Sequence, residues 1–335
     1  MTHMQATKSK AATLLTGATG FIGRRLLTLL TSQGVRCKAL VRGNDEFVAS
    51  KISRDDVYIG ELGNSIQNPN VYSDVDTIVH CAARVHNMNE SSSSLLETYR
   101  KVNRDLTLDF ARLSLNAGVR TFVFVSTVKV MGDFERTEKI LTEEDEPKPT
   151  DPYGISKYEA EKGLVQLFSN QSKSRCIILR LPMVYGPGNK GNMLSLLKAA
   201  SKRIPLPLRA ARGKRSMVYV ENVCDAIVRV SYGVQIDPQA IEAFFVTDGS
   251  DYSSNDLYKE IFKAMHGSNG TFWVPHTLLR LPARFNGKAR KILSRLMDDY
   301  RFSSEKLQRE YEWRPRFSFE HGIKETVAWY KKQYM

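Results

Sequence analysis

The stretch TGATGFIG at residues 16–23 predicts the fold of this chain. It follows directly on the apolar run 12–15 and precedes the leucine-rich segment 24–30, so a strand, a glycine turn and a helix succeed one another without a gap. Gly17 permits the turn, Gly20 lets backbone N–H groups approach an anion, and Gly23 allows the helix to pack closely on the strand. Glycines at this spacing also suit an ordinary tight turn, but the flanking strand and helix favour a cradle for the pyrophosphate of a dinucleotide.

A second motif predicts proton-transfer chemistry. The β-rich run 121–125 ends at Ser126-Thr127, and the later segment DPYGISK carries Tyr153 and Lys157 four residues apart. On a helix that spacing places the two side chains on one face. A lysine ammonium beside a phenol favours the phenolate, so we expect the pKa of Tyr153 to fall below its usual value of about 10. A tyrosine and lysine at this spacing are common on exposed helices, but together with the glycine stretch they indicate an acid–base pair.

The chain resembles the extended short-chain dehydrogenases/reductases, in the branch of nucleotide-sugar epimerases, dehydratases and 4-ketoreductases. The similarity extends over nearly the whole length. Beyond TGATGFIG and YGISK, the matching segments are VHCAARVH (79–86), YRKVNRDLT (99–107), LRLPMVYGPG (179–188), RSMVYVENVCDAI (215–227) and EWRPRFSFEHGIKETVAWY (312–330).

This resemblance implies roles for individual residues. Thr127, Tyr153 and Lys157 match the catalytic triad, Ser126 is the substitute if the strand register differs by one residue, and Asn103 matches the residue that supports the active-site backbone. The resemblance also implies a cofactor-binding set, which comprises Gly17, Thr19, Gly20, Phe21, Ile22, Arg42, Glu61, Leu62, Cys81, Ala82, Ala83, Asn103, Tyr153, Lys157 and Pro182.

The implied substrate is a UDP-sugar. Arg215 matches the arginine that grips the diphosphate of the nucleotide, and a guanidinium fork suits that group. Asn192 resembles a polar residue that meets the nucleotide near its phosphates, and Thr127 would hydrogen-bond the sugar. The alternatives for Arg215 and Asn192 are ordinary surface positions.

The order of apolar segments predicts an α/β protein with a Rossmann-type, doubly wound parallel sheet. Short apolar runs alternate with helical stretches such as 94–116 and 153–168. The amino-acid composition changes after Leu181, and from the resemblance we expect a smaller, discontinuous substrate-binding lobe. The predicted domains are 1–180 plus about 218–265 for the dinucleotide, and about 181–217 plus 266–335 for the nucleotide sugar.

Composition fits a globular enzyme. The chain has 335 residues, of which 42% are hydrophobic, enough for a substantial core. No apolar run has the roughly twenty residues that a membrane span needs, and the N-terminus lacks the apolar segment of a signal peptide. We therefore expect a cytoplasmic protein without an integral membrane segment. The four cysteines form no CxxC pair, which predicts reduced thiols and no metal site.

The formal net charge of +13 raises the question of nucleic-acid binding. The basic residues concentrate in 198–215 and 280–295, which the family places around the substrate, and no nucleic-acid motif accompanies them. We therefore expect no nucleic-acid partner. The remaining charge suits a solvated face or an anionic membrane surface. By resemblance, helices 94–116 and 153–168 form the interface of a homodimer.

The residues after Thr127 bear on the reaction. The family's 4,6-dehydratases carry an acidic pair there, whereas this chain has Val128 and Lys129, and a valine cannot protonate a leaving group. Two reactions stay open. One is NAD(P)H-dependent reduction of a UDP-4-keto-sugar of the UDP-N-acetylquinovosamine type for surface glycans, and the other is 4-epimerisation of UDP-glucose or UDP-N-acetylglucosamine with bound NAD.

The end of the second strand favours the reductase. An acidic residue there selects NAD by accepting the ribose hydroxyls, but the chain has Arg42, which suits the 2′-phosphate of NADP. Asp45 is the alternative ribose partner. Met131 replaces the tyrosine that most family members carry before the glycine, which leaves sugar orientation open. A cofactor-sensing protein without turnover is the alternative from another functional class, and the intact triad argues against it.

Overall fold

The computed structural model describes residues 11–84, 92–133, 139–233, 240–275 and 296–335. The basic segment 280–295 and the last two residues of VHCAARVH lie outside these residues. The chain divides into two compact units. One comprises Met1–Met131, Pro147–Arg180 and Ala226–Phe244, and the other comprises Gly132–Glu146, Leu181–Asp225 and Phe245–Met335.

The first unit is built on a seven-stranded sheet in the order β3-β2-β1-β4-β5-β6-β9. β1 pairs in parallel with β2 on one side and β4 on the other, with Leu15 opposite both Ala39 and Val79. The chain therefore winds outward in both directions from β1, and a crevice for a ligand is expected beyond the carboxyl ends of β1 and β4. The strands are β1 (Ala12–Thr16), β2 (Cys37–Val41), β3 (Val57–Ile59), β4 (Val75–His80), β5 (Thr121–Thr127), β6 (Arg175–Leu181) and β9 (Ile241–Phe245).

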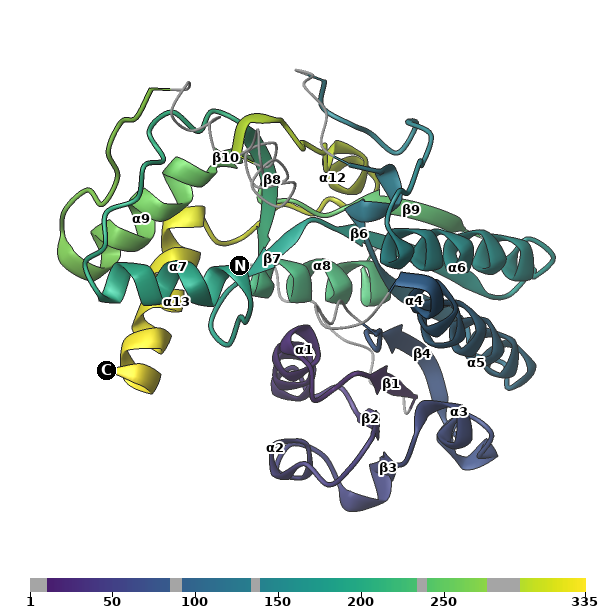
Figure 1. Ribbon diagram of the computed structural model, residues 1–335. Helices are drawn as coiled ribbons and strands as arrows, with labels where there is room; N and C mark the ends of the chain where they lie inside the picture. The colour runs from purple at the N-terminus through teal and green to yellow at the C-terminus, as the bar shows by residue number, and fades with distance from the viewer. Residues whose placement is uncertain (1–10, 85–91, 134–138, 234–239, 276–295) are drawn as a thin grey trace. The chain divides into compact units, whose positions relative to one another are not determined.

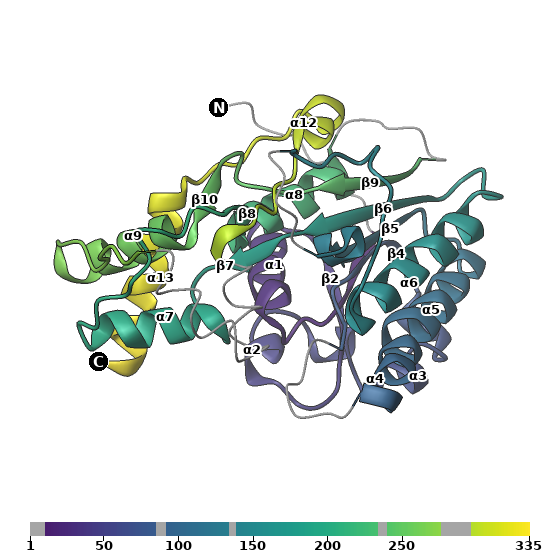
Figure 2. The same ribbon diagram turned by 45° about the horizontal axis from the view of Figure 1, so that its top comes forward.

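Helices cover this sheet, and Figures 1 and 2 show α4, α5 and α6 side by side. The main apolar core lies between these helices and the sheet. Phe110 of α5 and Leu164 of α6 pack there against Leu14, Ile78 and Phe122 from three strands. The helical segments are α1 (Phe21–Ser32), α2 (Glu46–Ala49), η1 (Arg54–Asp56), α3 (Leu62–Ser65), η2 (Pro69–Val71), α4 (Ser92–Tyr99), the π-helical turn η3 (Arg100–Asp105), α5 (Leu106–Asn116), η4 (Val128–Met131) and α6 (Pro152–Phe168).

The second unit has a three-stranded sheet in the order β10-β8-β7. Ser253 and Asp256 form a capping box that begins α9, and Gly267 ends that helix in the left-handed conformation. α8 begins in this unit and ends in the first. The elements are β7 (Met183–Tyr185), α7 (Asn192–Ser201), β8 (Lys214–Tyr219), α8 (Val220–Tyr232), β10 (Asp251–Ser253), α9 (Ser254–His266), α12 (Glu305–Tyr311) and α13 (Phe319–Tyr334).

The predicted doubly wound α/β fold is confirmed, including the late strand β9 that returns to the first sheet. The predicted helix 94–116 is instead two α-helices joined by a π-helical turn. The assignment of a cofactor domain and a substrate lobe stays a prediction, because a compact unit does not by itself identify a ligand.

Candidate functional site

The glycine stretch forms the turn between β1 and α1. Gly17 has a φ of +70°, which a residue with a side chain rarely adopts, and a Cβ on it would lie 2.9 Å from Ala82 N. A Cβ on Gly23 would lie 2.0 Å from Gly17 O, so the first turn of α1 lies directly against the loop. Gly20, the exposed N-cap of α1, has no side chain to cap the helix. These residues fit the pyrophosphate of a dinucleotide, because the free N–H groups at a helix start favour an anion.

A buried hydrogen-bond chain fixes the ends of β1 and β4 beside this loop. Thr16 Oγ1 lies 2.7 Å from His80 Nδ1 and accepts from Ala82 N at 3.2 Å, and His80 Nε2 lies 3.0 Å from Thr107 Oγ1. Burial lowers the pKa of His80 to about 3, so this imidazole is neutral and serves as a structural link. The half-buried Cys81, Ala82 and Ala83 follow at the strand end, where the cofactor set was expected.

Asn103 lies in the π-helical turn and is buried. Its Oδ1 accepts from Arg84 N at 2.8 Å, while its Nδ2 donates to Arg84 O at 3.1 Å and to Ser156 Oγ at 3.1 Å. The wider turn thus allows one side chain to hold both the segment after β4 and the start of α6. These contacts are compatible with the implied role of supporting the active-site backbone, which stays a prediction.

The three predicted triad residues all lie in the first unit. Thr127 ends β5, and Tyr153 and Lys157 occupy the first two turns of α6. Asp151 caps that helix by accepting from Gly154 N at 2.9 Å, and Pro152 follows at the first helical position. A Cβ on Gly154 would lie 2.6 Å from Lys129 O, so the helix start packs closely on the segment after Thr127.

The pKa of Tyr153 shifts in the direction opposite to the predicted one. We expected Lys157 to lower the pKa of Tyr153, but burial, Asp151 and Tyr99 raise it. The Lys157 amine instead donates to Val125 O at 2.7 Å and lies 3.7 Å from the centre of the Phe124 ring. Burial lowers the pKa of Lys157 to about 7. The Tyr153 phenol is therefore protonated at neutral pH and suited to donating a proton.

The end of β2 carries an exposed cation. Arg42 forms no ion pair or hydrogen bond with the residues that the structure describes. Asp45, the alternative ribose partner, caps α2 through Val48 N and pairs with Arg24 at 2.5 Å. Its carboxylate is therefore already engaged.

The remaining predicted cofactor residues occupy separate elements. Thr19 lies within the glycine loop, and its carbonyl oxygen accepts from Arg24 Nε at 3.1 Å. Phe21 and Ile22 begin α1. Glu61 is the N-cap of α3, which begins at Leu62.

Three further predicted residues belong to the second unit. Pro182 is buried directly after β6, and Asn192 is exposed at the start of α7. Arg215 lies half-buried on β8, opposite Tyr252 of β10, and also bridges to Tyr300. Their assignment to cofactor or substrate stays a prediction.

Sequence reasoning missed a buried ion pair behind the triad. Glu161 of α6 and Arg180 of β6 have side chains 3% and 7% exposed, with Arg180 Nη2 lying 2.7 Å from Glu161 Oε2. The partners are nineteen residues apart on different elements, so no local sequence motif predicts that they pair. The one available signal was that Glu161 continues the four-residue spacing of Tyr153 and Lys157.

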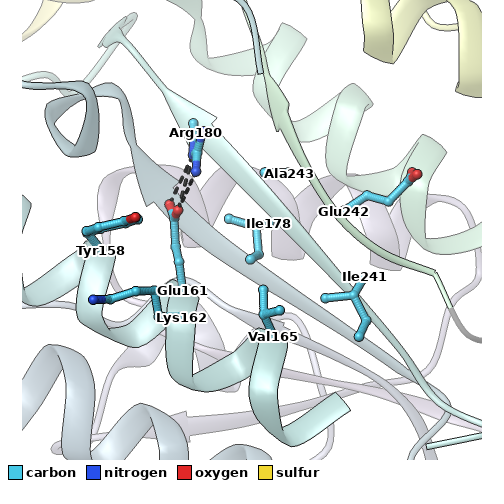
Figure 3. A pocket seen from close by; sticks show the side chains of 9 residues that line it. All are labelled: Tyr158, Glu161, Lys162, Val165, Ile178, Arg180, Ile241, Glu242 and Ala243. Carbon is cyan, nitrogen blue, oxygen red and sulfur yellow. Dashed lines mark hydrogen bonds and ion pairs between the residues drawn. The ribbon is translucent and has the colours of Figure 1, made fainter. Parts of the chain in front are cut away.

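A cavity of about 320 Å³ adjoins this pair (Figure 3). It lies at the β6–β9 end of the sheet, whereas the glycine loop follows β1 near the middle, so we do not assign it to the dinucleotide. Its lining residues are Tyr158, Glu161, Lys162, Val165, Ile178, Arg180, Ile241, Glu242 and Ala243.

The described residues contain neither a metal-binding cluster nor a membrane-spanning helix. No group of three or more His, Cys, Asp or Glu side chains is arranged to hold a metal ion. None of the helices in the described parts of the chain is both long and apolar enough to cross a membrane.

A glycine loop at the centre of a doubly wound sheet, with a tyrosine and a lysine on α6, is the arrangement of a dinucleotide-dependent enzyme. Residues 13–236 match the family model described as the NAD dependent epimerase/dehydratase family. The chain belongs to this family.

Individual relatives agree with this membership. The chain is 32% identical over 324 residues to a UDP-glucose 4-epimerase of Vibrio cholerae, covering 96% of this chain and 95% of that protein. It is 27% identical over 269 residues to the N-acetyl-alpha-D-glucosaminyl-diphospho-ditrans,octacis-undecaprenol 4-epimerase of Escherichia coli O157:H7, covering 79% and 76%. The structure of MoeE5 in complex with UDP-glucose and NAD has a TM-score of 0.74 at 20% identity, covering 97% of this chain and 100% of that one.

Proposed function

We propose that this protein is an NAD(P)H-dependent 4-ketoreductase of a UDP-4-keto-sugar, of the UDP-N-acetylquinovosamine type, serving surface-glycan synthesis. The observation that carries the proposal is the combination of Tyr153, a half-buried phenol whose pKa is raised, and Arg42, an exposed cation directly after β2. The first suits proton donation to a sugar oxygen, and the second suits a cofactor with a 2′-phosphate.

The residues have distinct roles in this proposal. The glycine loop and the start of α1 hold the pyrophosphate, and Lys157 holds the nicotinamide ribose. The bound cofactor supplies hydride to C4 of the sugar. Tyr153 donates its proton to the oxygen on C4 as negative charge develops there, and Thr127 hydrogen-bonds the same oxygen. Arg215 binds the diphosphate and Asn192 the adjoining part of the nucleotide.

The segment after Thr127 argues against 4,6-dehydration. Val128 and Lys129 have no carboxyl group that could act on a sugar. Val128 is also buried, and Lys129 pairs with Asp151. The second candidate function is UDP-sugar 4-epimerisation with retained NAD. The similarity to the Vibrio cholerae 4-epimerase over nearly the full length of both chains favours it.

A single incubation separates the two reactions. Purified protein is mixed with NADPH and a UDP-4-keto-6-deoxy-N-acetylhexosamine, and the sugar nucleotides are analysed by mass spectrometry while NADPH absorbance is followed. A reductase oxidises one NADPH per sugar and adds two hydrogen atoms to it. The proposal fails if the protein instead interconverts UDP-glucose or UDP-N-acetylglucosamine with their C4 epimers without net change of cofactor. Cofactor binding with neither reaction across a broad sugar panel would favour a sensing role.

We further propose a homodimer formed through α4, α5 and α6, and a cytoplasmic location, where NADPH and nucleotide sugars are available. Light scattering of the purified protein tests the first proposal. A monomer at micromolar concentration would contradict it.

A further inference from the structure

Glu161 extends the face of α6 that carries the proton-transfer residues. Tyr153, Lys157 and Glu161 succeed one another at intervals of four, so they lie along one side of the helix. Figure 3 shows the Glu161 carboxylate meeting the Arg180 guanidinium. Arg180 donates to it from both Nη2, at 2.7 Å, and Nε, at 3.1 Å. Two-point contact of this kind fixes both side chains.

The same carboxylate also holds the strand that ends at Thr127. Ser126 Oγ donates to Glu161 Oε1 at 2.5 Å, and Ser126 directly precedes Thr127. One residue earlier, Val125 O accepts from the Lys157 amine at 2.7 Å. Consecutive residues of β5 are thus attached to consecutive turns of α6.

Arg180 connects this cluster to a further segment. Its Nη1 lies 3.6 Å from the sulfur of Met131, the position where the family usually has tyrosine. Glu161 is therefore the centre of a buried cluster that joins β5, β6, η4 and α6. A single ionised member without its partner would be costly there, so the cluster acts as a unit.

The charge of Glu161 also acts on Lys157. Burial lowers the pKa of this lysine, and among its neighbours Glu161 raises that pKa most. Of the other titratable groups near this amine, Cys81 after β4 also raises its pKa, and His80 at the end of β4 interacts with it. Tyr153 shares its helix, and Arg180 of β6 is the ion-pair partner of Glu161.

We propose that Glu161 is a positioning residue for the proton-transfer groups, because its carboxylate fixes α6 against the end of β5 through Ser126 and places a negative charge one helical turn after Lys157. This inference rests on the proposed function, which gives Lys157 its role in binding the nicotinamide ribose. Glutamine at position 161 keeps the size of the side chain and removes the charge, and its NH2 group donates where one carboxylate oxygen accepted.

The test is a direct titration of Lys157. Protein labelled with ¹³C at the lysine ε carbon is titrated by NMR without cofactor, and the Lys157 signal is assigned by its loss in Lys157→Met. In Glu161→Gln we expect deprotonation of Lys157 about one pH unit or more below wild type. The alkaline limb of kcat against pH should move by the same amount, with KM for the sugar nucleotide unchanged.

Three further variants complete the design. Glu159→Gln removes another carboxylate of α6, which pairs instead with Arg100 and Arg104 of η3, and it should leave the Lys157 titration unchanged. Glu161→Asp keeps the negative charge on a side chain that is shorter by one carbon. It should restore the wild-type titration of Lys157, while kcat stays below wild type. If Glu161→Gln does not fold, the double variant Glu161→Met with Arg180→Met replaces the buried pair by apolar chains and should show the same downward shift.

The outcomes separate this inference from the proposed function. An unmoved Lys157 titration in Glu161→Gln, or the same shift in Glu159→Gln, overturns the positioning role even where the sugar is reduced. A shifted titration supports it even where no sugar nucleotide is turned over, because the NMR readout needs no substrate.

Discussion

Lys129 Nζ lies 2.5 Å from Asp151 Oδ2, and Asp151 caps the helix that carries Tyr153 two residues later. Lys129 stands where the family's dehydratases have an acid, so this chain uses the position to neutralise a carboxylate instead. Asp151 raises the pKa of Tyr153. We expect the paired Lys129 to oppose that effect, because its charge has the opposite sign.

We expect Lys129→Met to slow ketone reduction by about two- to fivefold, because an uncompensated Asp151 makes Tyr153 a weaker acid. The effect is small because the two side chains are 42% and 31% exposed and water screens them. The measurement is kcat against pH, in which the limb that reports Tyr153 should move to higher pH. Lys129→Arg keeps the charge and should resemble wild type. Equal profiles for the two variants would show that the pair has no influence on Tyr153.

Tyr153→Phe should reduce turnover by about 100-fold or more while cofactor affinity stays near wild type, because only the proton donor is lost. Steady-state kinetics and cofactor titration measure the two quantities. Tyr158→Phe removes a hydroxyl from the same helix, at the cavity rather than beside Thr127, and should retain full activity. Near-normal rates for Tyr153→Phe would remove Tyr153 from the mechanism.

Arg215→Ala should weaken binding of the sugar nucleotide by about 2 kcal/mol or more, as expected when one partner of a charge-assisted pair is removed. That corresponds to about 30-fold in Kd for UDP by calorimetry, with cofactor binding unchanged. Lys214→Ala changes the exposed neighbour on β8 and serves as the control. The same UDP affinity in both variants and wild type would make Arg215 a structural residue.

The lowered pKa of Lys157 predicts how stability varies with pH. The folded protein releases this proton near pH 7 and the unfolded chain near 10.5, the usual pKa of a lysine, so between these values the unfolded state binds more protons. The destabilisation from the buried ammonium is therefore complete below about pH 7 and declines as pH rises toward 10.5.

Lys157→Met should accordingly gain more stability over wild type at acidic than at alkaline pH. Denaturant midpoints of both proteins across this range measure the difference. Lys162→Met, an exposed lysine on the same helix, should show a constant difference. A difference that stays constant for Lys157→Met as well would mean that this lysine titrates normally.

The sequence predicted those features that depend on local spacing. The glycine turn and the spacing of Tyr153 and Lys157 on one helix each lie within a few residues, and the structure has both, with the helix predicted over 153–168 beginning at Pro152. The acidity of Tyr153 was predicted wrongly, since it depends on burial and on where the Lys157 amine points. The pair of Glu161 and Arg180 was missed because its partners meet only when α6 packs against β6.

Arg42 distinguishes the two candidate reactions. If its guanidinium faces the 2′-phosphate, wild type should bind NADPH more tightly than NADH by roughly tenfold or more, since a hydrogen bond to a charged group contributes about 1.5–3 kcal/mol. Arg42→Asp replaces attraction by repulsion and offers a carboxylate to the ribose hydroxyls, so it should reverse the order.

Arg54→Asp makes the same change of charge at another exposed site of the first unit and should leave the preference intact. Fluorescence titration with both cofactors measures these affinities. NAD retained through purification, together with an unchanged preference in Arg42→Asp, would favour the epimerase, because an enzyme that returns its hydride to the same sugar has no need to exchange its cofactor with the NADPH pool.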